Sequence, residues 1–171
     1  GLLSALHCVG KISKKKLKSY QTNGSELIAH PILNKKLGIE SSNGSLGQGL
    51  SFGCGMAISY KKKNKHGNIY VLIGDGECYE GSIWESAITA TEQKLDNLFV
   101  ILDCNGFQND GKIGNMMTYK NLLNKWRGFG WNVKTCDGHD LKKILENLSK
   151  RSKNKPTILI AKTKKGKGVS F

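Results

Sequence analysis

Long apolar runs are missing from this sequence of 171 residues. A helix needs about 20 consecutive apolar residues to cross a bilayer, so we expect no membrane-spanning segment and no membrane partner. The first residues, GLLSALHCVGKISKKK, place an apolar part before a basic part, which is the reverse of a secretory signal. These absences predict a cytoplasmic protein.

Paired cysteines and clustered histidines are missing as well. The cysteines have neither the spacing of a zinc site nor the density of a disulfide framework, so we expect reduced, mostly buried thiols. They are Cys8, Cys54, Cys78, Cys104 and Cys136. No Ser-His-Asp arrangement or zinc site can be assembled from the four histidines. There is also no Gly-x-x-x-x-Gly-Lys-[Ser/Thr] loop, and no Gly-x-Gly-x-x-Gly follows the first strand. These absences exclude hydrolases and zinc enzymes and argue against the familiar nucleotide-binding loops.

Acidic residues are scarce, with 13 Asp and Glu against 27 Lys and Arg, and the formal net charge is +14. Such a charge is compatible with nucleic acid, an anionic membrane surface or a phosphorylated small molecule. The lysines concentrate at expected helix ends and loops, as at 14–16, 61–63 and 164–167. We interpret them as solvated surface, so charge alone decides little.

Regular elements alternate along most of the chain. Continuous apolar runs predict strands at 69–73, 98–103, 131–136 and 157–162. Helical patterns occupy 2–8, 13–20, 49–60, 81–91, 119–128 and 139–150. We predict an α/β fold of three layers, in which a mainly parallel sheet carries helices on both faces.

The length favours a single domain over residues 1–171, and we expect native residues to be missing at both ends. The turn-rich stretch 21–47 is long for a loop in a compact domain, so we expect it to wrap a site. The small residues of the helix at 49–60 permit close approach to another backbone. Asp137-Gly138-His139-Asp140 predicts a turn followed by a helix cap.

Polar residues follow two consecutive strands of the predicted sheet. The first strand ends in Gly74-Asp75-Gly76, and Asn105 follows the second. Parallel strands joined by one crossover often lie side by side, and ligands bind outside their carboxyl ends. A carboxylate, an amide oxygen and a backbone carbonyl such as that of Phe107 suit Mg²⁺, which fills its other positions with water and phosphate. An ordinary strand-to-helix turn also uses Gly and Asp, but Asn105 favours the metal hypothesis.

A family resemblance adds to these residues. Seven segments resemble those of transketolases and occur in the same order. They are HP (30–31), NGSLGQG (43–49), GDGECYEGSIWE (74–85), KLDNLFVILDCNGFQNDG (94–111), GW (130–131), DGHD (137–140) and KTKKGKG (162–168). Gly74-Asp75-Gly76 followed about thirty residues later by Asn105 also resembles the thiamine diphosphate motif, whose spacer is a βαβ unit. The chain thus resembles the diphosphate-binding domain of a transketolase that is split into two polypeptides.

The resemblance implies specific roles for several residues. Asp75, Asn105 and the Phe107 carbonyl would bind Mg²⁺, for which Ca²⁺ or Mn²⁺ can substitute, and Gly76 would contact the diphosphate. The catalytic residue His30 and the loop of Gly44, Ser45 and Leu46 would lie against the cofactor. Glu80 would sit at an interface with a neighbouring subunit, whereas Glu77 receives no role. A loop-fixing histidine and a plain helix-start acid are the alternatives for His30 and Glu80.

The resemblance also implies a reaction and a partner. The enzyme would move a two-carbon ketol unit from a ketose to an aldose, with phosphorylated or nucleotide-linked sugars as substrates. The glutamate that activates thiamine diphosphate belongs to a pyrimidine-binding domain, which we expect on a separate C-terminal transketolase subunit in an α2β2 heterotetramer.

Three alternatives remain open at this point. A 1-deoxyxylulose-phosphate-type synthase and a 2-oxo acid dehydrogenase component share the cofactor motif, but both begin by decarboxylation. A basic nucleic-acid-binding module would need interleaved aromatic and basic residues on its sheet, which the apolar strands do not offer. We therefore expect no nucleic acid partner.

Overall fold

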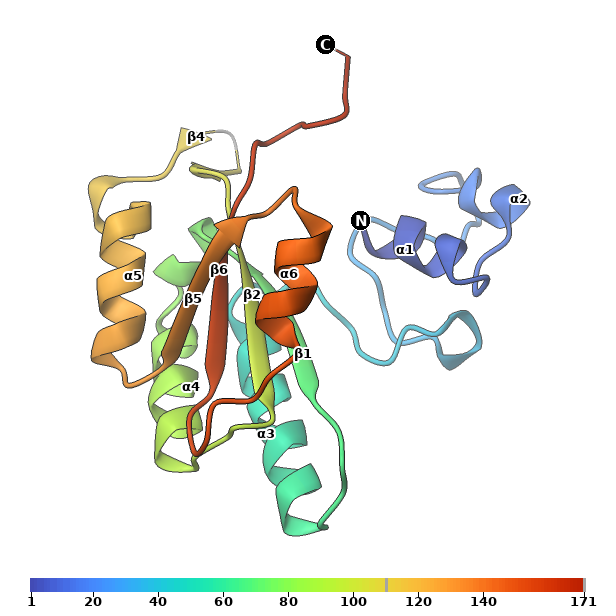
Figure 1. The fold of residues 1–171 in the computed structure, drawn as a ribbon. Helices are drawn as coiled ribbons and strands as arrows, with labels where there is room; N and C mark the ends of the chain where they lie inside the picture. Colours follow the sequence, from blue (N-terminus) through green and yellow to red (C-terminus); the bar gives the residue numbers. More distant parts are fainter. Residues whose placement is uncertain (110, 171) are drawn as a thin grey trace. The chain divides into compact units, whose positions relative to one another are not determined.

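The computed structural model describes residues 1–109 and 111–170 (Figure 1). The chain divides into two compact units, Gly1–Ser45 and Leu46–Phe171, and each unit is described by itself. Asp110, which belongs to the motif at 94–111, and Phe171 lie outside the described residues. A single domain over residues 1–171 stays a prediction.

The first unit contains short helices and turns around a small core. Its elements are α1 (Leu2–Cys8), α2 (Lys14–Leu17) and the 3₁₀ helix η1 (Lys35–Leu37). Ser13 caps α2, because its hydroxyl oxygen accepts from the Lys16 N–H at 3.1 Å. The predicted end at residue 20 is wrong. Beyond Leu17 the backbone forms tighter turns, because the Ser19 N–H donates to the Lys16 carbonyl at 3.0 Å and the Tyr20 N–H donates to the Leu17 carbonyl at 3.2 Å.

A four-stranded parallel sheet forms the centre of the second unit, in the order β1-β2-β6-β5. Its strands are β1 (Ile69–Gly74), β2 (Leu98–Cys104), β5 (Asn132–Asp137) and β6 (Thr157–Lys162). Gly74 is paired with Asp103, and Asp103 is paired with Ala161, so the carboxyl ends of three strands meet at one edge. The predicted side-by-side position of the first two strands is confirmed.

Helices cover both faces of this sheet (Figure 1). They are α3 (Gln48–Lys62), α4 (Gly81–Glu92), α5 (Tyr119–Gly128) and α6 (Leu141–Leu148). The helix α3 packs against β1, β2 and α4, whereas α6 packs against β5 and β6 on the opposite face. The three-layer α/β prediction is confirmed. The helix predicted at 139–150 starts later, at Leu141, because Asp140 caps it by accepting from the Lys143 N–H at 3.1 Å, and it ends at Leu148.

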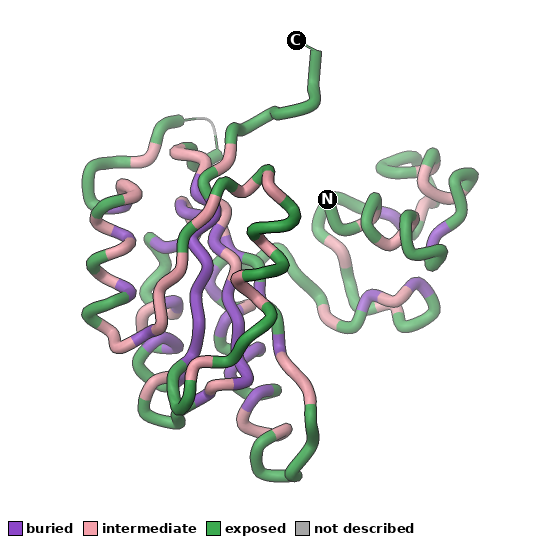
Figure 2. Tube along the Cα trace, viewed as in Figure 1, coloured by how far each residue is buried: buried purple, intermediate pink, exposed green. Residues whose placement is uncertain are grey.

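Buried residues concentrate on the central strands and on the helix faces that meet them (Figure 2). Trp126 and Trp131 belong to this core, with their ring centroids 4.9 Å apart. The edge strand β1 differs from the continuous burial that we predicted, since Tyr70 and Leu72 on one face are 53% and 71% exposed. The described residues therefore cover only one face of β1 closely.

The cysteines agree with the prediction of reduced, mostly buried thiols. Cys54, Cys78 and Cys104 are buried, and all five cysteines are free thiols. Burial raises the pKa of Cys54 to about 11, so this side chain stays a neutral thiol at ordinary pH. Among the described residues, none of the helices combines the length and apolar character that a bilayer crossing requires.

The glycines of α3 allow a direct test of the close packing between α3 and β1. A Cβ atom added to Gly53 would overlap Cγ2 of Val71 and lie 3.5 Å from Cδ1 of Leu98, whereas a Cβ on Gly55 meets nothing within 4 Å. We expect Gly53→Ala to lower the free energy of unfolding by about 1 kcal/mol, because overpacking costs more than the gain in helix propensity. Gly55→Ala on the same helix should raise it by about 0.5–1 kcal/mol.

Urea denaturation of the two variants measures both effects. Equal shifts in the same direction would contradict the packing account, because helix propensity alone acts alike at both positions.

Candidate metal centre

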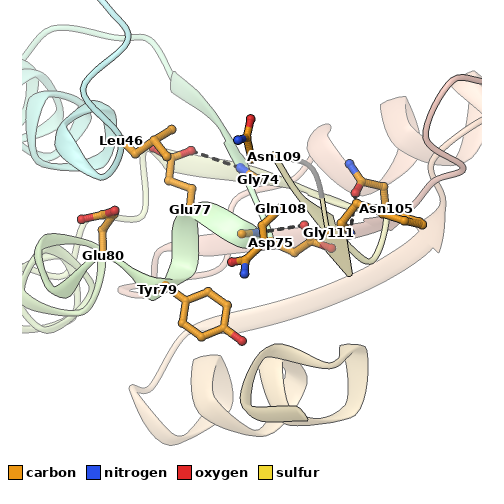
Figure 3. Close-up of a pocket in the computed structure, with 12 residues that line it drawn as sticks. Leu46, Gly74, Asp75, Glu77, Tyr79, Glu80, Asn105, Gln108, Asn109 and Gly111 are labelled. Atoms are coloured by element: carbon orange, nitrogen blue, oxygen red, sulfur yellow. Dashed lines mark hydrogen bonds between the residues drawn. The ribbon is translucent and has the colours of Figure 1, made fainter. Parts of the chain in front are cut away.

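The carboxyl ends of β1 and β2 bring Asp75 and Asn105 to one cavity of about 600 Å³ (Figure 3). The Asp75 N–H donates to the Asp103 carbonyl at 3.1 Å, so the strand pairing continues one residue past β1. Asp75 then turns its carboxylate across to the second strand, where Oδ2 accepts from the Gly106 N–H at 2.6 Å. The parallel order of the strands thus places the two predicted ligands together.

The carboxylate of Asp75 is buried, with only 1% of the residue exposed. Its other oxygen, Oδ1, accepts from the Gly76 N–H at 2.8 Å. Burial raises the pKa of Asp75, the two backbone donors lower it, and the charge of Asp103 raises it again. None of the described Lys, Arg or His residues forms an ion pair with it. A buried carboxylate without a cationic partner is costly, and a divalent cation bound at the free lone pairs removes that cost.

Asn105 and Phe107 are held by a turn that the sequence did not predict. Residues Phe107–Gln108 (β3) pair with Gly111–Lys112 (β4) in a short antiparallel hairpin. Asn105 Oδ1 accepts from the Phe107 N–H at 2.9 Å, which fixes the start of this hairpin. The hairpin lies close to Gly76, where an added Cβ would stand 2.7 Å from Cβ of Gln108. The glycine is therefore required for packing whether or not a phosphate approaches it.

The donor atoms fit a hard cation better than a soft one. Among residues 1–109 and 111–170, no group of three His, Cys, Asp or Glu side chains could hold a metal by itself. The predicted ligands comprise one carboxylate, one amide and one carbonyl, which leaves about half of an octahedral shell for water and phosphate. Cys104 lies between the ligand positions in sequence, but burial raises its pKa to about 11, so it does not offer a thiolate. The residues present fit Mg²⁺.

Glu77 carries a role that the sequence did not reveal. Its Oε1 accepts from the Gly47 N–H at 2.8 Å, and its Oε2 accepts from the Gly74 N–H at 3.1 Å. This carboxylate therefore connects the start of α3 to the end of β1, and its bond to Gly74 is drawn in Figure 3. Leu46, the residue before Gly47, lines the same cavity and is 57% exposed. A glycine-rich loop that opens a helix has backbone N–H groups without an acceptor inside the helix. This need for an acceptor was the signal in the sequence that could have indicated such a role for Glu77.

His30, Gly44 and Ser45 belong to the first unit. The structure brings two of them together, because a Cβ atom on Gly44 would overlap the imidazole ring of His30. Gly44 also has a positive φ of 125°, which favours glycine. The Asn43 N–H donates to the Pro31 carbonyl at 2.9 Å and holds the two segments side by side. Contact of His30, Gly44 and Ser45 with a cofactor stays a prediction.

Glu80 lies at the opposite end of the cavity from Asn105 (Figure 3). It occupies the residue before α4, where its side chain makes no capping hydrogen bond, and it is exposed. Gly47 packs against it, since a Cβ on Gly47 would stand 2.8 Å from Cβ of Glu80. The helix-start position agrees with the plainer alternative, and the interface role stays a prediction.

A family comparison decides what kind of domain carries this site. Residues 2–170 match the family described as the thiamine diphosphate binding domain of transketolase. The chain belongs to this transketolase family. The match covers nearly the whole sequence and includes every predicted metal ligand.

Curated transketolase relatives extend beyond this chain. An apulose-4-phosphate transketolase subunit of Actinobacillus succinogenes is 41% identical over 172 residues, which cover 100% of this chain and 62% of the relative. The 6-deoxy-6-sulfo-D-fructose transketolase subunit of a Clostridium species is 38% identical, over 99% of this chain and 62% of the relative. The chain thus spans less than two thirds of the length of these relatives.

Solved transketolase structures share the fold. The Campylobacter jejuni enzyme superposes with a TM-score of 0.79 at 32% identity, over 87% of this chain and 24% of that chain. The Leishmania mexicana enzyme gives a TM-score of 0.80 at 26% identity, over 95% of this chain and 26% of that chain. The present chain therefore corresponds to about a quarter of these transketolases.

Proposed function

We propose that this chain is the diphosphate-binding subunit of a two-polypeptide transketolase that requires thiamine diphosphate and Mg²⁺. The observation that carries the proposal is the buried carboxylate of Asp75, which has no cationic partner among the described residues and lines one cavity with Asn105. The family match supports the cofactor, and relatives that are named as individual transketolase subunits support a split enzyme.

The residues of this chain bind and orient the cofactor in the proposed enzyme. Asp75, Asn105 and the Phe107 carbonyl hold Mg²⁺, and Gly76 lets the backbone approach the diphosphate. Leu46 and His30 lie against the organic part of the cofactor. When bound, thiamine diphosphate supplies the carbanion chemistry, and the protein supplies orientation and electrostatics.

The activating glutamate comes, in this proposal, from a pyrimidine-binding domain on a partner chain. Two copies of each chain form a cytoplasmic α2β2 complex, in which Glu80 contacts a neighbouring subunit. The exposed position of Glu80 beside the cavity supports such a contact. The reaction transfers a two-carbon ketol unit from a ketose to an aldose.

The substrates that we propose are sugars with an anionic group. Both relatives above are named for sugars of this kind, one a phosphate and the other a sulfonate. A second cavity of about 640 Å³ on the α6 side of the sheet supports this class, because basic residues line its rim. They are Lys164, Lys165 and Lys167. A cationic rim raises the local concentration of anionic substrates.

Reconstitution tests the proposed function. The chain is purified alone and together with a candidate partner chain that carries a pyrimidine-binding domain, and ketol transfer is measured with thiamine diphosphate and Mg²⁺. We expect transfer between phosphorylated sugars by the pair and none by either chain alone, because the activating glutamate and the diphosphate site lie on different chains. Mass determination of the complex should give two copies of each.

Two results would contradict the proposal. Robust ketol transfer by this chain alone would remove the need for a partner. Release of CO₂ from pyruvate or another 2-oxo acid by the pair, without ketol transfer, would indicate a decarboxylating enzyme instead.

A further inference from the structure

We propose that Asp103 is a positioning residue that sets the orientation of the Asn105 amide and thereby presents its oxygen to the metal. The inference rests on the proposed function, because it concerns how a proposed metal ligand is held. Asp103 is not itself among the ligands that the sequence predicts.

Both carboxylate oxygens of Asp103 are engaged by side chains. Oδ2 accepts from Nδ2 of Asn105 at 3.1 Å, and Oδ1 accepts from the hydroxyl of Thr163. Thr163 is itself fixed by the backbone, since its N–H donates to the Cys104 carbonyl at 3.2 Å and extends the pairing of β2 with β6. The carboxylate is therefore anchored on one side before it meets Asn105 on the other.

The chemistry of these groups selects one of two amide orientations. An ionised carboxylate only accepts hydrogen bonds, so the amide group that faces Asp103 must be the NH₂. Oδ1 of Asn105 then points away from Asp103, and it accepts from the Phe107 N–H at 2.9 Å. Both contacts favour the same orientation. The reversed amide would place an oxygen against the carboxylate and an NH₂ against a backbone N–H, with repulsion at both contacts.

This orientation matters because a cation requires the oxygen of the amide. A freely rotating Asn105 would offer Mg²⁺ an oxygen in one orientation and an NH₂ in the other. Groups that orient metal ligands in this way change metal affinity by about 10–100-fold when they are removed. Asp103 also places a second negative charge near Asp75. Orientation and charge are separable, because Asn at position 103 keeps an acceptor oxygen and loses the charge.

The test compares Asp103→Ala with Asp103→Asn in the chain assembled with its partner. Calorimetry gives the apparent Kd of Mg²⁺ at saturating thiamine diphosphate. We expect Asp103→Ala to weaken Mg²⁺ binding about 10–100-fold and Asp103→Asn to stay within about threefold of wild type. In the Asn variant the side-chain oxygen accepts from Asn105, while its NH₂ donates to the Thr163 hydroxyl. Asp96→Ala, at the other end of β2, is the control and should leave the affinity unchanged.

Each outcome decides for or against the inference. If Asp103→Ala binds Mg²⁺ with wild-type affinity, the inference is overturned. If Asp103→Ala and Asp103→Asn lose Mg²⁺ affinity equally, the charge of Asp103 acts instead of its effect on orientation, which also overturns the inference. If Asp103→Ala does not fold, Thr163→Val and Thr163→Ser decide, because only the serine keeps the anchoring hydroxyl and should retain wild-type affinity. A wild-type complex that binds no thiamine diphosphate with Mg²⁺ contradicts the proposed function itself, and so the two failures are distinguishable.

Discussion

Asp75→Asn should weaken the Mg²⁺-dependent binding of thiamine diphosphate by at least about 100-fold while the chain stays folded. The substitution removes the only carboxylate among the predicted ligands. Without ligand, the free energy of unfolding should change little, because relief of a buried charge offsets the loss of one hydrogen bond. Asp75→Ala should bind equally poorly but lose stability as well, since the N–H groups of Gly76 and Gly106 both lose their acceptor.

Ligand-induced stabilisation measures this effect. At a cofactor concentration 100 times the wild-type Kd, with saturating Mg²⁺, binding stabilises the wild type by about 2.7 kcal/mol. A variant whose affinity is 100-fold lower gains only about 0.4 kcal/mol under the same conditions. The control is Asp137→Asn, which removes a charge at the carboxyl end of β5 and keeps an acceptor for the His139 N–H. An unchanged stabilisation in Asp75→Asn would show that Asp75 is not a metal ligand.

Sequence periodicity was sufficient for the main elements of the second unit. The continuous apolar runs of β2 and β6 are buried on both faces, and such runs carry a strong signal. Two-residue strands such as β3 and β4 carry no periodic signal, so the hairpin escaped prediction. The end of α2 was misplaced for a different reason. After α2 the N–H groups of Ser19 and Tyr20 donate to carbonyls three residues earlier instead of four, and composition does not reveal this change.

The candidate site was predictable to the extent that topology determines it. Asp75 and Asn105 each follow a strand, and parallel pairing brings strand ends together without any knowledge of side chains. Glu77 and Asp103 escaped because each accepts from at least one donor far away in the sequence, although Asp103 also accepts from Asn105 two residues later. Glu77 accepts from a residue 30 positions earlier, and Asp103 accepts from one 60 positions later. Only the folded chain shows which donors these acids meet.

Glu77→Ala should have the largest effect on stability, although Glu77 is not a predicted metal ligand. The carboxylate accepts from the N–H groups of Gly47 and Gly74, and hydrogen bonds to charged groups contribute about 1.5–3 kcal/mol each. It also lies at the N-terminus of α3, where the helix dipole favours a negative charge. We expect a loss of about 3 kcal/mol in the free energy of unfolding, measured by urea denaturation. Glu77→Gln keeps one acceptor oxygen and should lose about half as much.

The same substitution should weaken cofactor binding through Leu46. Glu77 fixes Gly47 by a hydrogen bond, and Leu46, the residue before Gly47, lines the cavity. Without this bond, we expect Leu46 to hold its position in the cavity less well. Glu85→Ala is the matched control, because Glu85 is exposed on α4, and its stability should stay within about 0.5 kcal/mol of wild type. Equal stability of the Glu77 and Glu85 variants would contradict the bridging role. Lower stability with unchanged cofactor affinity would show that Glu77 stabilises the fold but does not contribute to cofactor binding.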